Sequence, residues 1–466
     1  MKHILSIIAV GGALLLSGCG DDFMNQYPSN SVTENNFYRT DNDFNQAVYG
    51  CYYKLKTNSG FLITELAYRS DEAELTAMAV STQDRYDIDH FDERPNNGLT
   101  SDVWNAWYNG IYRCNDVLQH MEGKSLENGD KYRGECLFLR SWYYFCLYRT
   151  FGVVPLTRVT VRPAEAQNIP RCTEEEIYTL LSEDLAEAAS LLPDKKSAEV
   201  ARVTSCSAWA LLGKVELTFK HPDKAKAALE KAMANTNYGL ETTTARAFDV
   251  TNKMNKEIIF ALYYNKSTDN GHGYWFGSIT NVHKDIRNPT QLLRDSYDDT
   301  DNRKTLVNDY IEVTKNKLYV LPKWYDTYDA TYTTVVGNDF PLLRYADVVL
   351  MYAEALADSN LSEAITWLNK TRTRAGLPEL TTADVPSRQV FIQELAKERG
   401  REFALEGQRW FDLVRLDKVE EVMNAVFAKD SGRHAQRTPF TANSYRLPIP
   451  QSVLDANENL VQNPGY

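Results

Sequence analysis

The sequence is poor in the residues and motifs that hold metals or carry out common hydrolytic chemistry. It has seven histidines, none of them three or four residues from another, and it contains no Cys-x-x-Cys. His-Glu-x-x-His, Gly-x-Ser-x-Gly and the phosphate loop Gly-x4-Gly-Lys-Ser/Thr are also missing. We therefore expect no metal, no cofactor and no catalytic residue of these classes.

Basic residues are also in the minority. Lys and Arg number 51 against 63 Asp and Glu, so the formal net charge is −12. Such a chain repels nucleic-acid phosphates, and nucleic acid is not an expected partner. With 43% hydrophobic and 24% charged residues in 466, the composition is that of a folded globular protein, and no stretch after the N-terminus approaches 18 apolar residues.

The N-terminus has the layout of an export signal. Lys2 precedes an apolar run from Ile4 to Leu16, which at roughly 20 Å of helix is too short for a permanent membrane span. Leu16-Ser-Gly-Cys19 is similar to a bacterial lipobox, so residues 1–18 are predicted to be removed and Cys19 to carry lipid. Plain secretion with a coincidental cysteine is the alternative. Residues 19–42 are polar and predict a tether.

Helical periodicity dominates the rest, and the predicted fold class is mainly α. Apolar residues recur every three or four positions, Asp102 and Thr173 are expected to cap two of the helices, and Trp209-Ala-Leu-Leu-Gly213 matches the first helix of a tetratricopeptide repeat. The expected helices span residues 43–56, 102–121, 131–151, 174–192, 205–235 (a helical pair), 342–357, 362–374, 388–406 and 410–428.

The periodicity breaks between residues 237 and 341. Short strands are predicted at 258–264 and 317–323, separated by segments rich in Gly, Asn, Asp and Thr. We therefore expect one domain over residues 43–466: a tetratricopeptide-like helical scaffold over 43–236 and 342–466, with a loop-rich, ligand-binding excursion between them. The six cysteines after Cys19 are expected to be buried free thiols, although the compartment would permit one disulfide.

Two acidic clusters are ambiguous in sequence. Asp71-Glu-Ala-Glu74 could form a salt-bridged surface, contact ligand hydroxyls or, least expected, take part in catalysis. Asp299-Thr-Asp301-Asn-Arg303 begins like a calcium loop but places Arg at a ligand position, so a solvated acidic turn is expected. Paired carboxylates are defined by their separation in space, and a glycoside hydrolase therefore stays an alternative.

Aromatic residues give the best indication of a binding site, since the chain has 28 Tyr, 18 Phe and 8 Trp. Trp142-Tyr-Tyr-Phe145 lies within one predicted helix and is expected to be core. Tyr274, Trp275 and Phe276 lie in a glycine-rich loop, where consecutive rings cannot all be buried and can stack on sugars. Candidate ligand-binding residues are therefore Trp275, Tyr274, Phe276, Trp104, Arg85 and Asp71, with a local aromatic plug, or helix packing for Trp104, as the alternative.

Several segments, taken together and in order, resemble the SusD/RagB family of bacterial nutrient-binding lipoproteins. They are 136–156, which begins Cys-Leu-Phe-Leu-Arg-Ser-Trp, then 341–355, 368–378, 398–413, 447–450 and the closing Asn463-Pro-Gly-Tyr466. The resemblance implies a helical fold, a cell-surface position on the outer membrane and a SusC-like TonB-dependent transporter as partner. The charged segment 398–412 is expected to form a buried network and not a ligand site.

The resemblance does not identify the ligand, because binding residues in this family lie on variable loops. We expect a non-catalytic, lipid-anchored protein that captures oligosaccharides and passes them to the transporter. A peptide-binding homologue is the alternative within the family, since aromatic rings also accept peptide side chains.

Overall fold

The computed structural model describes residues 37–56, 69–75, 83–194, 201–265, 288–313, 316–320, 322–324, 337–429 and 440–466. The signal segment, Cys19 and the aromatic loop residues Tyr274, Trp275 and Phe276 lie outside the described residues. Among the helices that are described, none is both long and apolar enough to cross a membrane.

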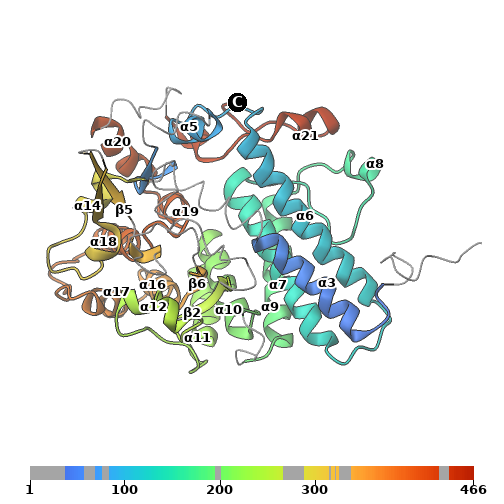
Figure 1. Ribbon diagram of the computed structural model, residues 1–466, viewed down its shortest axis with the longest axis horizontal. Helices are drawn as coiled ribbons and strands as arrows, with labels where there is room; N and C mark the ends of the chain where they lie inside the picture. Colours follow the sequence, from blue (N-terminus) through green and yellow to red (C-terminus); the bar gives the residue numbers. More distant parts are fainter. Residues whose placement is uncertain are drawn as a thin grey trace, which may run out of the picture.

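Four long helices lie side by side in one half of the molecule (Figure 1). They are α3 (Asp41–Lys54), α6 (Gly98–Met121), α7 (Gly129–Phe151) and α9 (Glu174–Leu191), close to the predicted spans. Thr173 caps α9, and its hydroxyl accepts the backbone N–H of Glu176. The cap predicted at Asp102 is wrong: α6 begins one turn earlier, where the Asn97 side chain accepts the N–H of Thr100.

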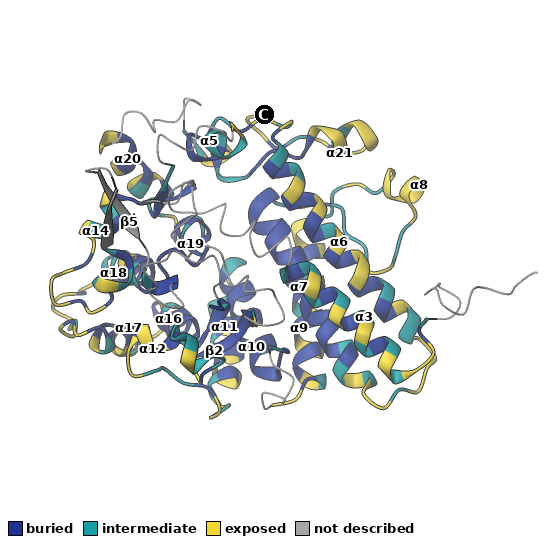
Figure 2. Cartoon of the chain, in the orientation of Figure 1, coloured by how far each residue is buried: buried dark blue, intermediate teal, exposed yellow. Residues whose placement is uncertain are grey.

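Helix α7 is buried on all sides because other helices surround it (Figure 2). Trp142 through Phe145 are each at most 3% exposed, which confirms that this aromatic run is core. Tyr143 reaches α6 at Gly110, where any side chain would collide with its ring. The six cysteines after Cys19 are free thiols, and all but the partly exposed Cys172 are buried, as expected.

The tetratricopeptide-like pair is present. Helices α10 (Ser205–Thr218) and α11 (Pro222–Met233) pack together closely because Leu229 lies directly over Gly213. Helix α11 then packs on α16 (Tyr345–Leu356), which pairs with α17 (Leu361–Arg374). The prediction that α16 begins at residue 342 is wrong, because residues 340–344 form a strand.

This strand, β6 (Phe340–Arg344), pairs with β2 (Ile258–Leu262) in a buried antiparallel sheet. Strand β2 confirms one expected strand, while the other, β5 (Asn316–Val320), ends before residue 323 and pairs with β4 (Asp309–Val313). A third small sheet joins β1 (Ala73–Glu74) to β3 (Asn288–Pro289). Through β2 and β6, the beginning and the end of the loop-rich excursion are held together.

The last helices are shorter than predicted. Helix α18 (Arg388–Glu402) ends before a turn in which Leu405 has a φ of 62°, and a second break at Asp417 (φ 57°) separates α19 (Arg409–Arg415) from α20 (Val419–Lys429). Left-handed residues cannot continue an α-helix. Short elements complete the chain: α5 (Gln83–Asp89), α8 (Pro163–Ala166), α12 (Thr244–Ala247), η4 (Val250–Asn252), α14 (Gln291–Asp295), α15 (Lys304–Val307), η6 (Pro322–Trp324), η7 (Ala442–Tyr445) and α21 (Gln451–Ala456).

A buried ion network centred on Arg344 joins these parts. The Arg344 guanidinium contacts Glu257 at 2.6 Å, Glu402 at 3.0 Å and Glu406 at 2.8 Å. Arg374 binds Glu257 and Glu402 as well. All these side chains are at most 5% exposed, so the charges balance one another in place of water. The network expected from segment 398–412 is confirmed.

Arg303, which lies within the excursion, extends the network. Its guanidinium binds Asp301 at 2.8 Å, Glu398 at 2.7 Å and Glu402 at 3.1 Å. The expectation of a solvated acidic turn at residues 299–303 is therefore wrong for Asp301, which is 2% exposed, because Arg303 draws its carboxylate into the interior.

Replacing Glu402 by Gln should lower the free energy of unfolding by about 3–5 kcal/mol, because it leaves buried guanidinium groups uncompensated. The neighbouring guanidinium groups hold the pKa of Glu402 well below its usual range. The contribution of ionised Glu402 to the free energy of unfolding is therefore present above about pH 4.5 and is lost as the pH falls. Urea unfolding at pH 7 and pH 4 should show a smaller difference between variant and wild type at the lower pH. Glu421→Gln, an exposed pair with Lys418, serves as control and should change little; equal effects of both variants would contradict the role of the network.

Candidate functional site

An aromatic hollow of 280 Å³ lies where two chain segments leave the described body. Lys56 on its wall is the last described residue before segment 57–68, and Tyr263 lies two residues before the described chain stops at 265. We call it the tyrosine hollow, and it is lined by Tyr49, Tyr52, Tyr53, Leu55, Lys56, Ala201, Arg202, Phe260, Ala261, Leu262 and Tyr263.

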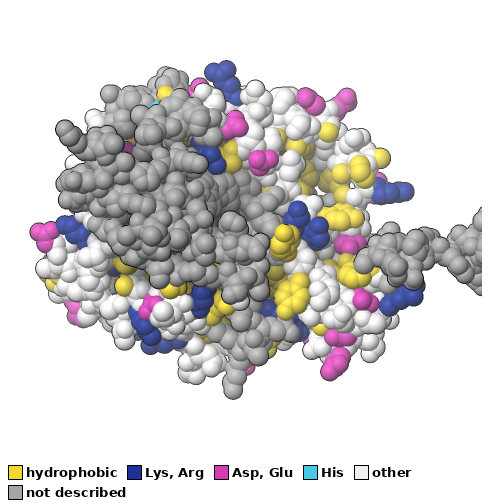
Figure 3. All heavy atoms as spheres, viewed as in Figure 1, with side chains coloured by type: hydrophobic (Ala, Val, Ile, Leu, Met, Phe, Trp, Pro, Cys, Tyr) yellow, Lys and Arg dark blue, Asp and Glu magenta, His cyan; other side chains and the backbone are white. Residues whose placement is uncertain are grey.

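Helix α3 presents two tyrosines to solvent at the tyrosine hollow. Tyr49 and Tyr53 are four residues apart and so lie on the same face of the helix, where their exposed fractions are 40% and 63%. Figure 3 shows hydrophobic side chains and Lys or Arg side chains close together over the end of α3. Exposed rings beside cationic donors form the kind of surface that binds sugars.

Arg202 fixes the Tyr49 ring. Its Nε lies 3.1 Å from the Glu135 carboxylate and its Nη1 donates to Asn45 Oδ1 at 2.7 Å, while the guanidinium lies 4.5 Å from the Tyr49 ring centroid. Arg202 and Glu135 are buried, so the guanidinium cannot swing away without leaving a buried charge. The exposed ring of Tyr49 therefore rests on a rigid cationic support.

The neighbouring Tyr52 has a different role. Its hydroxyl accepts the backbone N–H of Val203 at 3.2 Å, and burial, helped by the Glu135 carboxylate, raises its pKa well above the ordinary value. Tyr52 is thus a neutral anchor that holds α3 against residue 203.

Residues just after β2, within the excursion, make a second set of contacts beside this hollow. Tyr264 donates its N–H to Asp339 Oδ1 at 2.9 Å, and Lys253 binds the same carboxylate at 2.7 Å. Lys56 lies 4.7 Å from the Tyr264 ring centroid, and Lys253 lies 4.7 Å from that of Tyr263. The strand end that leads toward Tyr274, Trp275 and Phe276 is therefore fixed at the hollow.

The structure resolves two roles that the sequence left open. Trp104 is 5% exposed and packs against Tyr108 and Phe151, which favours its helix-packing role. The Asp71 carboxylate pairs with both Arg409 Nε (2.7 Å) and Nη2 (2.8 Å), which favours the salt-bridged interpretation. Arg85 lies partly buried on α5.

The acidic cluster, residues 71–74, contacts the residues that directly follow segment 266–287. Ala73 pairs with Pro289, and Thr290 donates its N–H to the carbonyl of Glu72 at 3.0 Å and its hydroxyl to that of Asp71. Residues 71–74 are therefore adjacent to the point where the chain returns from segment 266–287.

Sequence reasoning missed Tyr49 and Tyr53, although their four-residue spacing on an amphipathic helix was visible.

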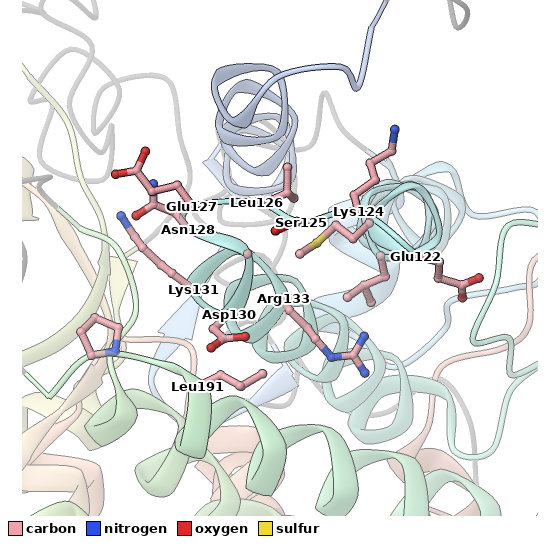
Figure 4. A pocket seen from close by; sticks show the side chains of 14 residues that line it. Glu122, Lys124, Ser125, Leu126, Glu127, Asn128, Asp130, Lys131, Arg133 and Leu191 are labelled. Atoms are coloured by element: carbon pink, nitrogen blue, oxygen red, sulfur yellow. The ribbon is translucent and has the colours of Figure 1, made fainter.

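A larger hollow of 650 Å³ lies at the turn between α6 and α7 and suits sugars less well (Figure 4). Its rim carries charged side chains, among them Lys124, Lys131 and Glu127. Another lining residue, Arg133, is paired with Glu187. The apolar surface of the hollow comes from aliphatic residues such as Leu118 and Leu191. Without an aromatic ring in its lining, it offers no stacking surface. Elsewhere in the described part of the chain, no group of three or more His, Cys, Asp or Glu side chains is placed to hold a metal ion.

Profiles of known protein families match two separate parts of the chain. The profile of the SusD family matches residues 307–466, and a profile described as "Starch-binding associating with outer membrane" matches residues 22–217. "SusD-like protein P2" from Formosa agariphila is 27% identical, and the match covers 97% of this chain and 98% of the relative.

Solved structures share the same fold over nearly the whole length. A SusD superfamily protein from Bacteroides vulgatus has 25% identity and a TM-score of 0.78, covering 92% of this chain and 100% of the other. A structure named "Laminarin binding SusD-like protein" has 25% identity and a TM-score of 0.74, covering 91% and 99%. The mainly helical fold is therefore shared with these proteins.

Replacing Glu72 by Gln should raise the free energy of unfolding at pH 8 by about 1–3 kcal/mol. Burial, and then the Asp71 charge, raises the pKa of Glu72 to about 8, so its contribution is full below about pH 4.5 and is lost as the pH rises toward 8. Gln keeps an acceptor for the N–H of Leu405, 3.1 Å away, but does not titrate. Denaturant unfolding between pH 5 and 8 should show that the stability of the variant relative to wild type increases as the pH rises. The exposed Glu122→Gln control should have the same pH dependence as wild type. If the difference in unfolding free energy between variant and wild type stayed constant from pH 5 to pH 8, the raised pKa of Glu72 would be contradicted.

Proposed function

We propose that this chain, which belongs to the SusD family, is a lipid-anchored protein that captures oligosaccharides and delivers them to a SusC-like TonB-dependent transporter. Surface glycan-binding proteins of this family are associated with the outer membrane and are non-catalytic, which removes the glycoside hydrolase alternative. The ligand, the transporter and the anchor are the parts that go beyond family membership.

The observation that carries the ligand proposal is the exposed pair Tyr49 and Tyr53 at the tyrosine hollow. Their rings are accessible, Arg202 holds one of them in place, and Lys56 supplies a donor at the rim. A sugar stacks its apolar face on such rings, and its hydroxyl oxygens accept hydrogen bonds from the cationic side chains. The part of the excursion that is predicted to carry Trp275 follows Tyr263, which lines the same hollow.

Laminarin is the first ligand to test, because a structure of the same fold is named for binding it. In the proposed arrangement an oligosaccharide stacks on the rings of the tyrosine hollow, and Tyr274, Trp275 and Phe276 are the further contacts that the sequence predicts. A peptide would use the same rings, so peptide capture is the outcome that the experiment must distinguish.

Tyr53→Ala should weaken laminarin oligosaccharide binding by about 1–3 kcal/mol, because it removes an exposed stacking ring. Isothermal titration calorimetry on the full-length protein in detergent measures this, and Trp275→Ala should have an effect of similar size. Tyr112→Ala removes a ring that is 51% exposed on α6 outside the hollow, and this control should bind as wild type does. Wild-type affinity in both Tyr53→Ala and Trp275→Ala would exclude the site, and binding of oligopeptides instead of glycans would exclude the proposed ligand class.

Cys19→Ser should release the protein from the outer membrane, since it removes the thiol proposed to carry lipid. Metabolic labelling with palmitate and protease treatment of intact cells measure acylation and surface position together. Wild type should be labelled and digested, while Cys172→Ser, which changes a partly exposed thiol of the folded body, should behave as wild type. A protected wild-type protein would contradict the surface position.

A further inference from the structure

A separate cavity of 180 Å³ is lined by residues of α7, α10, α19 and the C-terminal segment. It shares no lining residue with the tyrosine hollow. Among its described lining residues one carboxylate, Asp412, faces five cationic side chains, which are Arg149, Lys214, Lys220, Arg415 and Arg446. We call it the basic cavity.

Two of these five cations are neutralised by carboxylates. Lys214 lies 2.6 Å from Asp347, and Arg415 binds both Glu354 and Asp412. Asp412 also accepts from Arg399 at 2.8 Å, so its oxygens are already occupied. Lys220 at the rim donates to the carbonyl oxygen of Arg415 at 2.6 Å, and its ion pair with Asp417, at 3.3 Å, is exposed and weak.

Arg149 is different, because it forms no ion pair with any described residue. It is 8% exposed, its Nε has no hydrogen-bond partner, and its one hydrogen bond goes from Nη2 to Cys146 Sγ at 3.8 Å. The guanidinium lies between two rings, 4.4 Å from the Phe145 centroid and 4.2 Å from that of Phe411. It is thus a buried charge held in place by two rings, ready to bind an oxyanion with two parallel hydrogen bonds.

Arg446 adds a second guanidinium without a carboxylate bound to it among the described residues. Its Nη1 donates to the carbonyl oxygens of Tyr148 and Arg149. The nearby Glu174 carboxylate acts on it only at a distance and is itself bound by the Tyr148 hydroxyl. Burial, which disfavours the charged form, lowers the pKa of both Arg446 and Lys214.

We propose that the basic cavity binds a compact oxyanion, a carboxylate or a sulfate group, with Arg149 and Arg446 as the principal donors and Lys220 at the entrance. At 180 Å³ the cavity is smaller than a typical pocket for a drug-sized ligand, so the group is a free ion or the acidic substituent of one sugar unit. The site does not depend on the tyrosine hollow, and either one can exist without the other.

The test is calorimetric titration of the full-length protein in detergent, at constant ionic strength, with sodium sulfate, sodium glucuronate and glucose. Saturable binding of sulfate or glucuronate with one site per chain, and none of glucose, is expected. Sulfate alone would identify a free-ion site, and glucuronate alone would identify a sugar-acid site. Arg149→Met should weaken binding at least about tenfold, since it removes the bidentate donor but keeps a side chain between the two rings.

Two further variants keep the test decisive if Arg149→Met does not fold. Lys220→Gln changes a rim residue and should weaken binding several-fold with an unchanged circular dichroism spectrum, whereas Lys226→Gln, on α11 outside the cavity, should bind as wild type does. The proposal is overturned if neither anion binds saturably to wild type, or if Lys220→Gln and every folded Arg149 variant bind as tightly as wild type.

Discussion

The buried ion network around Arg344 is the constraint on which the arrangement of this protein depends. It joins Glu257, just before β2, to Glu402 at the end of α18 and to Glu406 in the turn that follows, and Arg303 links a later part of the excursion to Glu402. Because unpaired charge is costly in the interior, these segments have to meet in one register. Elements that are far apart in sequence are thereby held in fixed relation.

The candidate glycan site depends on that constraint. Strand β2 begins beside Glu257 and pairs with β6, whose last residue is Arg344 itself, so the position of β2 follows from the network. The same strand, within the excursion, ends at the tyrosine hollow, just before segment 266–287. The segment that follows β2 therefore starts from a point that is fixed beside α3 and Arg202, as is usual for binding loops on rigid scaffolds.

Local patterns predicted most of the helices, because a 3.6-residue period and caps such as Thr173 are contained within one segment. The failures have nonlocal causes. Residues 342–344 continue the helical pattern but are taken by β2 into a strand, and Asp301 looks solvated until Arg303 and Glu398 enclose it. The tyrosine hollow was missed for the same reason, since Arg202 meets Tyr49 across about 150 residues of sequence.

Two arginines in this fold show why a buried charge is not by itself evidence of a binding site. Arg344 and Arg149 are both buried, but the first is surrounded by three carboxylates and the second by two aromatic rings. The surroundings of Arg344 satisfy its donors within the protein, which makes it part of the scaffold. The rings around Arg149 orient its guanidinium, and no carboxylate among the described residues balances its charge, which is why Arg149 is the donor proposed for a ligand in the basic cavity.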